Sequence, residues 1–568
     1  MDFSLKKFSK EIFRAIQSFS LRERIIFVCA LIALIVSCSF LFILFSNSGT
    51  TKLPLSGGKI HDGVIGAPRF INPLLAQTES ELDLTTLVYS GLMRKVDEGV
   101  YIPDLAESYS ISSDGKEYTF VLRKDLIFHD NVRLTADDVI YTVTQAQDPT
   151  LKSPRSVNWQ GVRVEKIDTH TVVFKLSQPF AGFLDAVILG IMPEHIWNYT
   201  DSASMVYDTH NVRPVGSGPY SVRSIIEHND GTPKEYKLKR FKKFALGVPY
   251  IRIINITFFN SFKEQYDAFR AHEISSMTFL SHEHGLEKKM PRYKNTVPLN
   301  RNFGLFFNTT ASKNPLLTQK GVQVLEILLN KEQLINDVLG GYGTVLQGAL
   351  PPSLKSYSYT PYTDEQAVEL IQKLGWTYNP SRDTLATSSD TTASPLKITL
   401  STGNAKHLIA TAEHIRDQLS RAGIIVDVVP YDSETLANSV LAKRNFEVLL
   451  FGQGFQHDTS LFAFWHSSQR LYPGLNITQY VNKVTDNLLD KARVINDFTS
   501  RLSRYQSLDA TLVTDRPALF LYAPMVITIS SRFENRVIPK SYSKPSDRWN
   551  LVYQWYVRTH RVWNAFLK

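Results

Sequence analysis

The first residues whose types could do chemistry lie between positions 122 and 139, LRKDLIFHDNVRLTADDV. His129 stands next to Asp130, and Asp138 follows closely, so the stretch could hold a general base or a metal ligand. A structural interpretation accounts for the same residues. Thr135 and Asp138 have the spacing of a capping box at a helix start, and His129-Asp130-Asn131 is typical of a turn after a strand. We therefore predict that this cluster frames the fold.

Other chemical motifs are weak. His282-Glu283-His284 alternates two histidines without a third ligand nearby, which favours a solvated loop over a metal site. The sequence contains no Gly-x-Ser-x-Gly elbow and no His-Glu-x-x-His helix, and Gly216-Ser217-Gly218 has the wrong spacing. It also lacks a phosphate-binding Gly-x-x-x-x-Gly-Lys loop. We predict that the protein is not an enzyme and that it uses no metal or cofactor. An exported hydrolase is the competing class, and turnover of generic esters, peptides or glycosides would support it.

An uncharged apolar run, IIFVCALIALIVSCSFLFILF, extends from Ile25 to Phe45. Its length suits a helix that crosses a bilayer. Basic residues precede it, which predicts a cytoplasmic N-terminus and an extracytoplasmic body. A cleaved signal peptide and a lipoprotein processed at Cys38 are alternatives, although the apolar residues after Cys38 argue against the second. In all three interpretations the rest of the chain after the apolar run is exported. The basic residues are Lys6, Lys7, Lys10, Arg14, Arg22 and Arg24.

Composition limits the classes of function. The chain has 568 residues, of which 43% are hydrophobic and 21% charged, as in an ordinary globular protein. Both cysteines, Cys29 and Cys38, lie in the apolar run, so the exported body has neither disulfides nor thiolate metal sites. The net charge is 63 − 54 = +9, and the first 24 residues supply +3 of it. The remaining basic residues are scattered, which excludes a nucleic-acid-binding stripe.

Local patterns predict the elements around these residues. Glu117 to Leu122 alternates with period two after the turn Ser113-Asp114-Gly115, which indicates a strand. Thr363 with Gln366, and Asn330 with Gln333, have the spacing of helix starts, and Gly340 and Gly375 suit the ends of those helices. Two polar segments are predicted outside these elements: a tether at Ser46 to Gly58, and an exposed loop at Asn379 to Pro395.

A series of blocks in a fixed order makes the chain recognisable. It closely resembles family 5 extracellular solute-binding proteins of ABC importers, the oligopeptide/dipeptide/nickel-binding class. The resemblance runs from about Lys59 to the C-terminus. The blocks are residues 102–109 (IPDLAESY), 112–115 (SSDG), 118–123 (YTFVLR), 128–130 (FHD), 134–139 (LTADDV), 214–220 (PVGSGPY), 303–308 (FGLFFN), 329–334 (LNKEQL), 340–343 (GGYG) and 364–376 (DEQAVELIQKLGW).

The resemblance implies an α/β, two-lobed periplasmic-binding-protein fold, class II-like with an extra subdomain, in addition to one N-terminal transmembrane helix. A monomer is expected. The predicted organisation is a cytoplasmic basic segment (1–24), an anchor (25–45), a tether (46–58), lobe 1 (59–300) with an inserted subdomain (about 81–187), lobe 2 (301–522) and a return to lobe 1 (523–568).

The family binds an extended peptide between strands, through its main chain. In peptide-binding relatives an Asp in a Trp-x-x-Asp stretch holds the amino group of the ligand. The matching positions here are Phe451 and Gly454, and Asp458 stands four residues later, so amine anchoring is in question. Val322 also replaces a frequent Arg, for which we have no functional interpretation. The predicted ligand-binding residues are Phe70, Asn72, Phe306, Asn308, Gly452, Gly454, Phe455, Gln456 and Asp458.

The loop from Gly452 to Phe455 is predicted to line the cleft, because glycines permit close backbone approach and the aromatic ring offers a stacking face. A tight turn with a core phenylalanine is the alternative.

The predicted function is a membrane-anchored extracytoplasmic receptor that captures a peptide-like solute and delivers it to an ABC permease with its ATPase subunits. A sensor or adhesin with the same fold is the second possibility, and co-purification with permease subunits separates the two. Peptides, modified peptides, oligosaccharides and metal chelates all remain open as ligands.

Overall fold

The computed structural model describes residues 18–281, 293–308, 314–379, 384–387, 396–456, 460–532 and 534–564. The chain forms two compact units. One consists of Met1–Ser56 with Tyr556–Lys568, and the other of Gly57–Trp555. Each unit has its own secondary structure.

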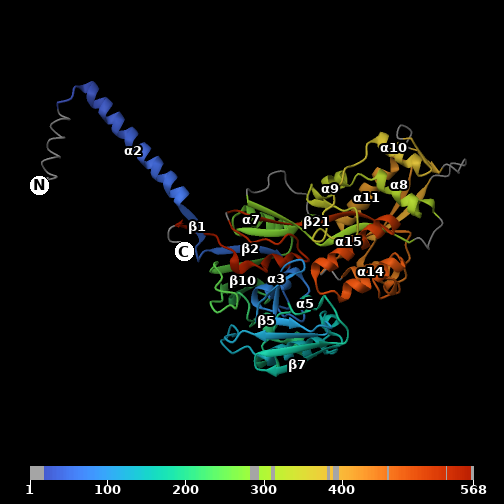
Figure 1. The fold of residues 1–568 in the computed structure, drawn as a ribbon, viewed down its shortest axis with the longest axis horizontal. Helices are drawn as coiled ribbons and strands as arrows, with labels where there is room; N and C mark the ends of the chain where they lie inside the picture. The colour runs from blue at the N-terminus through green and yellow to red at the C-terminus, as the bar shows by residue number, and fades with distance from the viewer. Residues whose placement is uncertain are drawn as a thin grey trace. The chain divides into compact units, whose positions relative to one another are not determined.

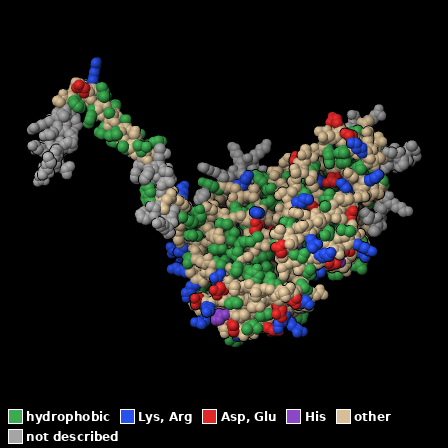
Figure 2. All heavy atoms as spheres, viewed as in Figure 1, with side chains coloured by type: hydrophobic (Ala, Val, Ile, Leu, Met, Phe, Trp, Pro, Cys, Tyr) green, Lys and Arg blue, Asp and Glu red, His purple; other side chains and the backbone are tan. Residues whose placement is uncertain are grey.

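The first unit contains one long apolar helix and a two-stranded ribbon. Helix α2 (Leu21–Gly49) begins with a capping box between Ser20 and Glu23. Its stretch Leu21–Leu41 is long and apolar enough to cross a membrane, consistent with a membrane anchor or a signal sequence. Figure 2 shows hydrophobic side chains along the Leu21–Leu41 part of this helix and charged ones at its N-terminal end. Strand β1 (Thr50–Pro54) follows directly and pairs antiparallel with β22 (Thr559–Trp563), so part of the predicted tether is helical or extended.

The second unit is built on a mixed sheet in the order β19-β18-β20-β14-β21-β12-β2-β11-β10-β9, with β13 and β15 also pairing with β21 (Figure 1). Helices separate several of its strands along the chain, as α7 (Phe262–Arg270) separates β11 from β12 and α11 (Lys406–Ser420) separates β18 from β19, which is typical of a mixed α/β fold. The strands are β2 (Lys59–Ile65), β9 (Tyr220–Glu227), β10 (Pro233–Arg240), β11 (Ile253–Phe259), β12 (Ser276–Leu280), β13 (Tyr293–Pro298), β14 (Arg301–Phe307), β15 (Gly343–Val345), β18 (Lys397–Gly403), β19 (Ile425–Tyr431), β20 (Val448–Gly454) and β21 (Ala518–Ser530).

Strand β21 joins the two halves of this sheet. Its first part, from Ala518 to Pro524, pairs with β14 and β15, and its second part, from Met525 to Ser530, pairs with β12 and β13. Nearly all of its 13 residues are buried, as expected for a strand covered on both faces. The two sets of strands correspond to the lobes of a periplasmic-binding-protein fold, while the exact lobe boundaries stay a prediction.

A separate four-stranded sheet lies within the segment predicted as the inserted subdomain. Its order is β5-β6-β8-β7. The alternation predicted for Glu117–Leu122 is confirmed, since Tyr118, Phe120 and Leu122 are buried while Glu117 and Val121 are exposed. Its strands are β5 (Ala106–Ile111), β6 (Glu117–Leu122), β7 (Val162–Asp168) and β8 (Thr171–Leu176), and the paired strands β3 (Met93–Asp97) and β4 (Val100–Pro103) precede them.

The helices start and end where local signals predict. Thr363 and Gln366 form a capping box on α10 (Asp364–Lys373). Asn330 caps α9 (Lys331–Leu339), and Gly340 ends it in the left-handed conformation that glycine favours. Further α-helices among the described residues are α3 (Glu79–Val88), α4 (Ala136–Gln147), α5 (Phe183–Ala186), α6 (Glu194–Trp197), α7 (Phe262–Arg270), α8 (Gln319–Leu328), α11 (Lys406–Ser420), α13 (Leu461–Trp465), α14 (Lys483–Val494) and α15 (Phe498–Asp515).

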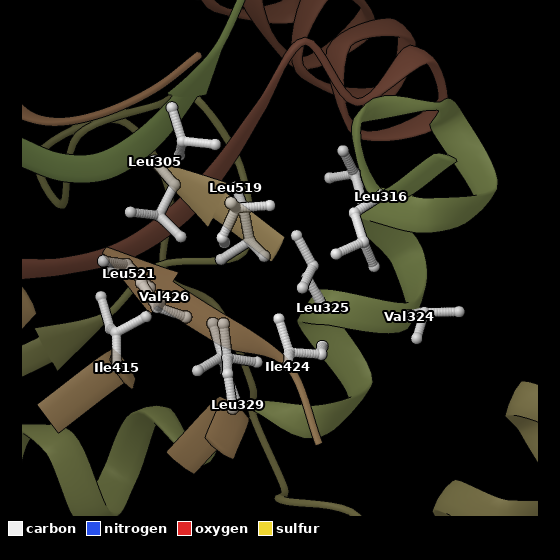
Figure 3. Packing of buried hydrophobic residues seen from close by; sticks show 14 of the residues in the cluster. Leu305, Leu316, Val324, Leu325, Leu329, Ile415, Ile424, Val426, Leu519 and Leu521 are labelled. Carbon is white, nitrogen blue, oxygen red and sulfur yellow. The ribbon is translucent and has the colours of Figure 1, made fainter. Parts of the chain in front are cut away.

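The helices around β14 and the start of β21 enclose a hydrophobic core. Figure 3 shows Leu305, Leu519 and Leu521 from the sheet together with Leu325 of α8 and Leu329, the residue that follows this helix. Val322 belongs to the same core and is 1% exposed, so the position where relatives often carry Arg has a packing role here.

Candidate functional site

The cluster at His129 has a structural role, as predicted, because its side chains bond to neighbouring loops and to a helix start. The Nε2 atom of His129 lies 3.0 Å from the carbonyl of Gly218, and its Nδ1 accepts the N–H of Gly216 at 3.4 Å. Because one nitrogen donates and the other accepts, the ring is held neutral. Burial lowers the pKa of His129 to about 4. This histidine connects the turn after Phe128 to the loop before β9.

The neighbouring aspartates have structural partners. Asp138 accepts the backbone N–H of Thr135 at 2.8 Å, and the Thr135 hydroxyl accepts the N–H of Asp137, which completes the predicted helix start. Asp130 lies 2.7 Å from His195. No group of three or more His, Cys, Asp or Glu side chains suited to a metal occurs within the described residues, and His282-Glu283-His284 falls outside them.

The predicted ligand residues Phe70 and Asn72 lie in the loop after β2. Asn72 is fully buried; its amide donates to Asn211 and its carbonyl oxygen accepts the N–H of Leu74. Phe70 is half-buried, and its backbone N–H donates to the Glu81 carboxylate at 3.1 Å. Asn72 therefore shapes this loop from inside, and its contact with a ligand stays a prediction.

Phe306 and Asn308 occupy the end of β14 and the residue after it. Phe306 is fully buried, with its ring centroid 6.4 Å from that of Trp465. Asn308 is 3% exposed and donates through its amide to the carbonyl of Arg444 at 2.8 Å. Phe306 packs in a second hydrophobic cluster with Trp465 and Phe455, and Asn308 is buried against the turn before β20, so direct ligand contact by either side chain would require local rearrangement.

The predicted glycine loop lies at the end of β20. This strand pairs with β14 along its whole length, so that Gly452 is opposite Phe303 and Gly454 is opposite Arg301. On its other side it pairs with β18 from Val448 to Leu450. In the part of the chain that the structure describes, residues 451–454 therefore have a β-partner on one side only.

The two glycines differ in the space around them. A Cβ atom at Gly452 would lie 2.7 Å from the ring of Phe303, whereas the nearest atom to a Cβ at Gly454 is the Arg301 Nε, at 4.0 Å. Gly452 is thus required by packing, and Gly454 has room for a side chain.

The residues after Gly454 turn inward and then outward. Phe455 is 1% exposed and packs its ring 5.2 Å from that of Phe464, so the alternative of a core phenylalanine fits this position. The side chain of Gln456 is exposed. Asp458 lies outside the described residues.

A buried lysine that the sequence did not reveal connects distant segments next to this loop. The Lys95 Nζ donates to Glu98 at 3.0 Å, to the carbonyl of Gln456 at 3.1 Å and to the hydroxyl of Ser543 at 3.3 Å. Asn300 donates to the same Glu98 oxygen at 3.2 Å. Burial alone would lower the pKa of Lys95, but the charges of Glu98 and Asp185 outweigh it and raise that pKa.

Lys544 and Arg155 add positive charge beside Lys95. The pKa of Lys544 is lowered by burial and by repulsion from Arg155 and Lys95, while Asp547 opposes the shift. Arg155 donates to the carbonyl of Ala76 at 3.2 Å, and burial lowers its pKa. We call Lys95, Arg155 and Lys544 the cationic corner. Carboxylates balance part of this charge, since the Lys95 Nζ lies 3.0 Å from Glu98 and 3.7 Å from Asp185, and Asp547 attracts Lys544.

The corner combines residues that are far apart in the sequence. Lys95 belongs to the predicted subdomain, Gln456 to predicted lobe 2, and Ser543 and Lys544 to the predicted return segment. Only the contact between Lys95 and Glu98 has a local sequence signal, which is their spacing of three residues. The other contacts depend on the tertiary fold, which brings distant segments of the chain together.

Comparison with known proteins agrees with this fold. Residues 100–471 match the model of the bacterial extracellular solute-binding proteins, family 5. The chain is 26% identical over 498 residues to the oligopeptide-binding protein AppA of Bacillus subtilis, covering 84% of this chain and 89% of AppA. It is 24% identical to the dipeptide-binding protein of Escherichia coli, covering 80% of this chain and 87% of that protein.

Solved structures show the same architecture. The ABC transporter substrate-binding protein CtaP of Listeria monocytogenes matches with a TM-score of 0.70 at 24% identity, covering 88% of this chain and 99% of CtaP. Bacillus subtilis AppA in complex with a nonapeptide matches with a TM-score of 0.63 at 23% identity, covering 89% of this chain and all of AppA. The fold is thus that of the periplasmic binding proteins. The chain belongs to family 5 of the bacterial extracellular solute-binding proteins, whose members bind solutes and are not enzymes.

Proposed function

We propose that this protein is a membrane-anchored extracytoplasmic receptor that captures a peptide-like solute by lobe closure and delivers it to an ABC permease. The names of its relatives, oligopeptide-binding and dipeptide-binding proteins, support a peptide. The chain lacks a phosphate-binding loop, so ATPase subunits of the permease would supply the energy of transport.

One observation carries the peptide proposal: the one-sided pairing of β20 from Phe451 to Gly454. Backbone N–H and C=O groups along this edge can pair with an extended chain, as in recognition by β-strand addition. Gly452 and Gly454 leave the edge uncovered by side chains of their own. Binding of this kind depends little on the side chains of the ligand, which suits a receptor for peptides of varied sequence.

The charges near this edge affect which end groups of a ligand, amino or carboxylate, can bind there. Gly454 supplies no carboxylate for an amino group, and Arg301 lies opposite it in β14. The cationic corner lies beyond Gln456, where the Lys95 Nζ contacts the Gln456 carbonyl. We therefore propose that the receptor holds an anionic group of its solute, such as a carboxylate, more firmly than a free amine.

The mechanism follows from contacts that span the predicted lobes. A ligand that touches both lobes only when they are closed stabilises the closed state by its difference in affinity for the two states. Helix α2 would keep the receptor at the membrane, with its N-terminus in the cytoplasm. A surface made from both lobes would then dock on the permease.

Native mass spectrometry of the soluble part, Gly57 to Lys568, tests the proposal. A gently purified sample is compared with a denatured one, and a released mass series that matches peptides is expected. A protein that carries no ligand and gains no thermal stability with any peptide pool would contradict a peptide solute. Co-purification of the full-length chain with permease subunits tests delivery, because a sensor or adhesin would not bind permease subunits.

A further inference from the structure

The ribbon that follows the apolar helix has an unusual composition. We define the juxtamembrane ribbon as residues 50–56 and 556–564, which include β1 and β22. Its register pairs Thr50 with Trp563 and Lys52 with Arg561. The first residue after the helix is therefore opposite a tryptophan.

The ribbon carries only one sign of charge. It contains Lys52, Arg558, Arg561 and His560, and its two segments, TTKLPLS and YVRTHRVWN, contain no Asp or Glu. All four of these basic side chains are exposed, and Trp563 is 36% exposed. A short two-stranded ribbon with little buried surface needs another surface to hold it.

The helix fixes how far the ribbon can lie from a bilayer. Helix α2 has 29 residues and is therefore about 43 Å long at about 1.5 Å per residue. The hydrocarbon layer takes about 30 Å of this length, and each headgroup layer adds roughly 5 to 7 Å. The apolar run ends at Phe45 and the ribbon begins at Thr50. Those four residues span about 6 Å at about 1.5 Å per residue, which is about the depth of one headgroup layer, so the ribbon starts at the outer edge of the headgroups.

We propose that the juxtamembrane ribbon binds the surface of the membrane, with its basic side chains on the phosphates of anionic phospholipids and Trp563 at the interface. Tryptophan favours that depth because its ring is amphipathic, and clustered Lys and Arg are attracted to anionic lipid surfaces. The inference rests on the proposed membrane anchor. It turns the expected flexible tether into a fixed attachment formed by both ends of the body.

The test uses the full-length protein in nanodiscs of phosphatidylcholine alone or mixed with phosphatidylglycerol. The contribution of Trp563 to the fluorescence is obtained by subtracting the spectrum of the variant Trp563→Phe. We expect lipids brominated near the headgroup to quench this contribution, roughly twofold more strongly with phosphatidylglycerol present. Equal quenching in the two lipid mixtures, or none, would overturn the proposal.

A charge variant and a matched control locate the effect. The triple variant Lys52→Gln, Arg558→Gln, Arg561→Gln should lose the dependence on phosphatidylglycerol. The control Lys116→Gln, Lys124→Gln, Arg133→Gln removes three exposed charges from the body and should retain it. A dependence that survives the ribbon substitutions would contradict binding through these cations.

Hydrogen exchange of the β1 and β22 amides shows whether the ribbon still forms in the charge variant. If it does not, high salt on the unchanged protein takes the place of the variant, and quenching that resists salt would overturn the proposal. The intact mass of the protein from membranes distinguishes failure of the anchor itself, because a cleaved chain lacks α2.

Discussion

At the scale of single residues, we expect the identity of residue 454 to influence which end group of a ligand the predicted cleft accepts. An aspartate at Gly454 fits without a clash, since its Cβ would have no neighbour closer than the Arg301 Nε at 4.0 Å. We expect Gly454→Asp to raise the affinity for free-amine peptides about tenfold, the effect of one charge-assisted hydrogen bond weakened by exposure and by Arg301. Titration calorimetry with free-amine peptides and their N-acetylated forms measures it.

The matched control for that substitution is Asn445→Asp, which adds the same charge at an exposed position in the loop before β20. It should leave the preference between the free and acetylated peptides unchanged. Equal affinities of the wild-type protein and Gly454→Asp across the panel would mean that residue 454 does not face the amino group of the ligand.

His129 gives the protein a defined dependence on pH. Its pKa falls from 6.5 to about 4 on folding, because burial disfavours the imidazolium. The unfolded chain therefore binds the proton more tightly, and the stabilisation present above pH 6.5 is lost as the pH falls toward 4. At pH 5 we expect the free energy of unfolding to decrease by about 2 kcal/mol from this residue.

Chemical denaturation of His129→Gln at pH 7.5 and pH 5 checks this effect. The glutamine can still bond to the loop of Gly216 and Gly218, and the loss between the two pH values should shrink by about 2 kcal/mol. His228→Gln, at an exposed position in the β9–β10 turn, should keep the full loss. An unchanged loss in His129→Gln would place the acid sensitivity elsewhere.

Sequence patterns predict candidate segments but not the direction in which their side chains point. The loop after β2 and the end of β20 were predicted as ligand-facing, but Asn72 and Phe306 point into the protein. A chain position does not reveal whether a polar side chain bonds to its own loop or faces a ligand. Lys95 was missed because its partners Gln456 and Ser543 are hundreds of residues away.

At the scale of elements, the contact between β20 and β14 explains why Gly452 is glycine. In Gly452→Ala the new methyl group would lie 2.7 Å from the Phe303 ring, which is itself stacked on Tyr522 with centroids 5.1 Å apart. We expect the free energy of unfolding to fall by about 1 to 3 kcal/mol, typical of overpacking. Urea denaturation measures it.

Gly454→Ala is the control on the same strand, because its methyl group would meet no atom closer than 4.0 Å. Its free energy of unfolding should change little. Equal destabilisation by the two substitutions would mean that the contact with Phe303 is not its cause, because the lower flexibility of alanine by itself favours the folded state.

Helix boundaries could be predicted because caps are local. The boxes at Thr135 and Thr363 and the glycine at position 340 act within one turn of their own helix. Strand order could not be predicted in this way. β21 pairs with β14 and β12, and such pairing depends on contacts between segments hundreds of residues apart. The resemblance to a family supplied the architecture that these local patterns could not.

At the scale of the whole molecule, the contacts between the predicted subdomain and lobe 2 bear on closure. The Tyr118 hydroxyl of β6 donates to the Asn496 side chain at 3.2 Å, and the N–H of Ala181 donates to the Arg493 carbonyl at 2.8 Å. Both partners in lobe 2 belong to α14 or to the segment that follows it. If these contacts belong to the closed state, removing one of them weakens solute binding without touching the solute.

Tyr118→Phe removes one such contact and keeps the ring in its core position next to Phe183, 4.7 Å away between centroids. A net hydrogen bond contributes about 0.5 to 1.5 kcal/mol, so the closed state should become about two- to tenfold less populated. The Kd of the bound solute should rise by the same factor, and small-angle scattering should show a larger radius of gyration. Tyr109→Phe, on neighbouring β5, is the control and should change neither quantity; a Kd unaffected by Tyr118→Phe would mean that this contact persists when the lobes open.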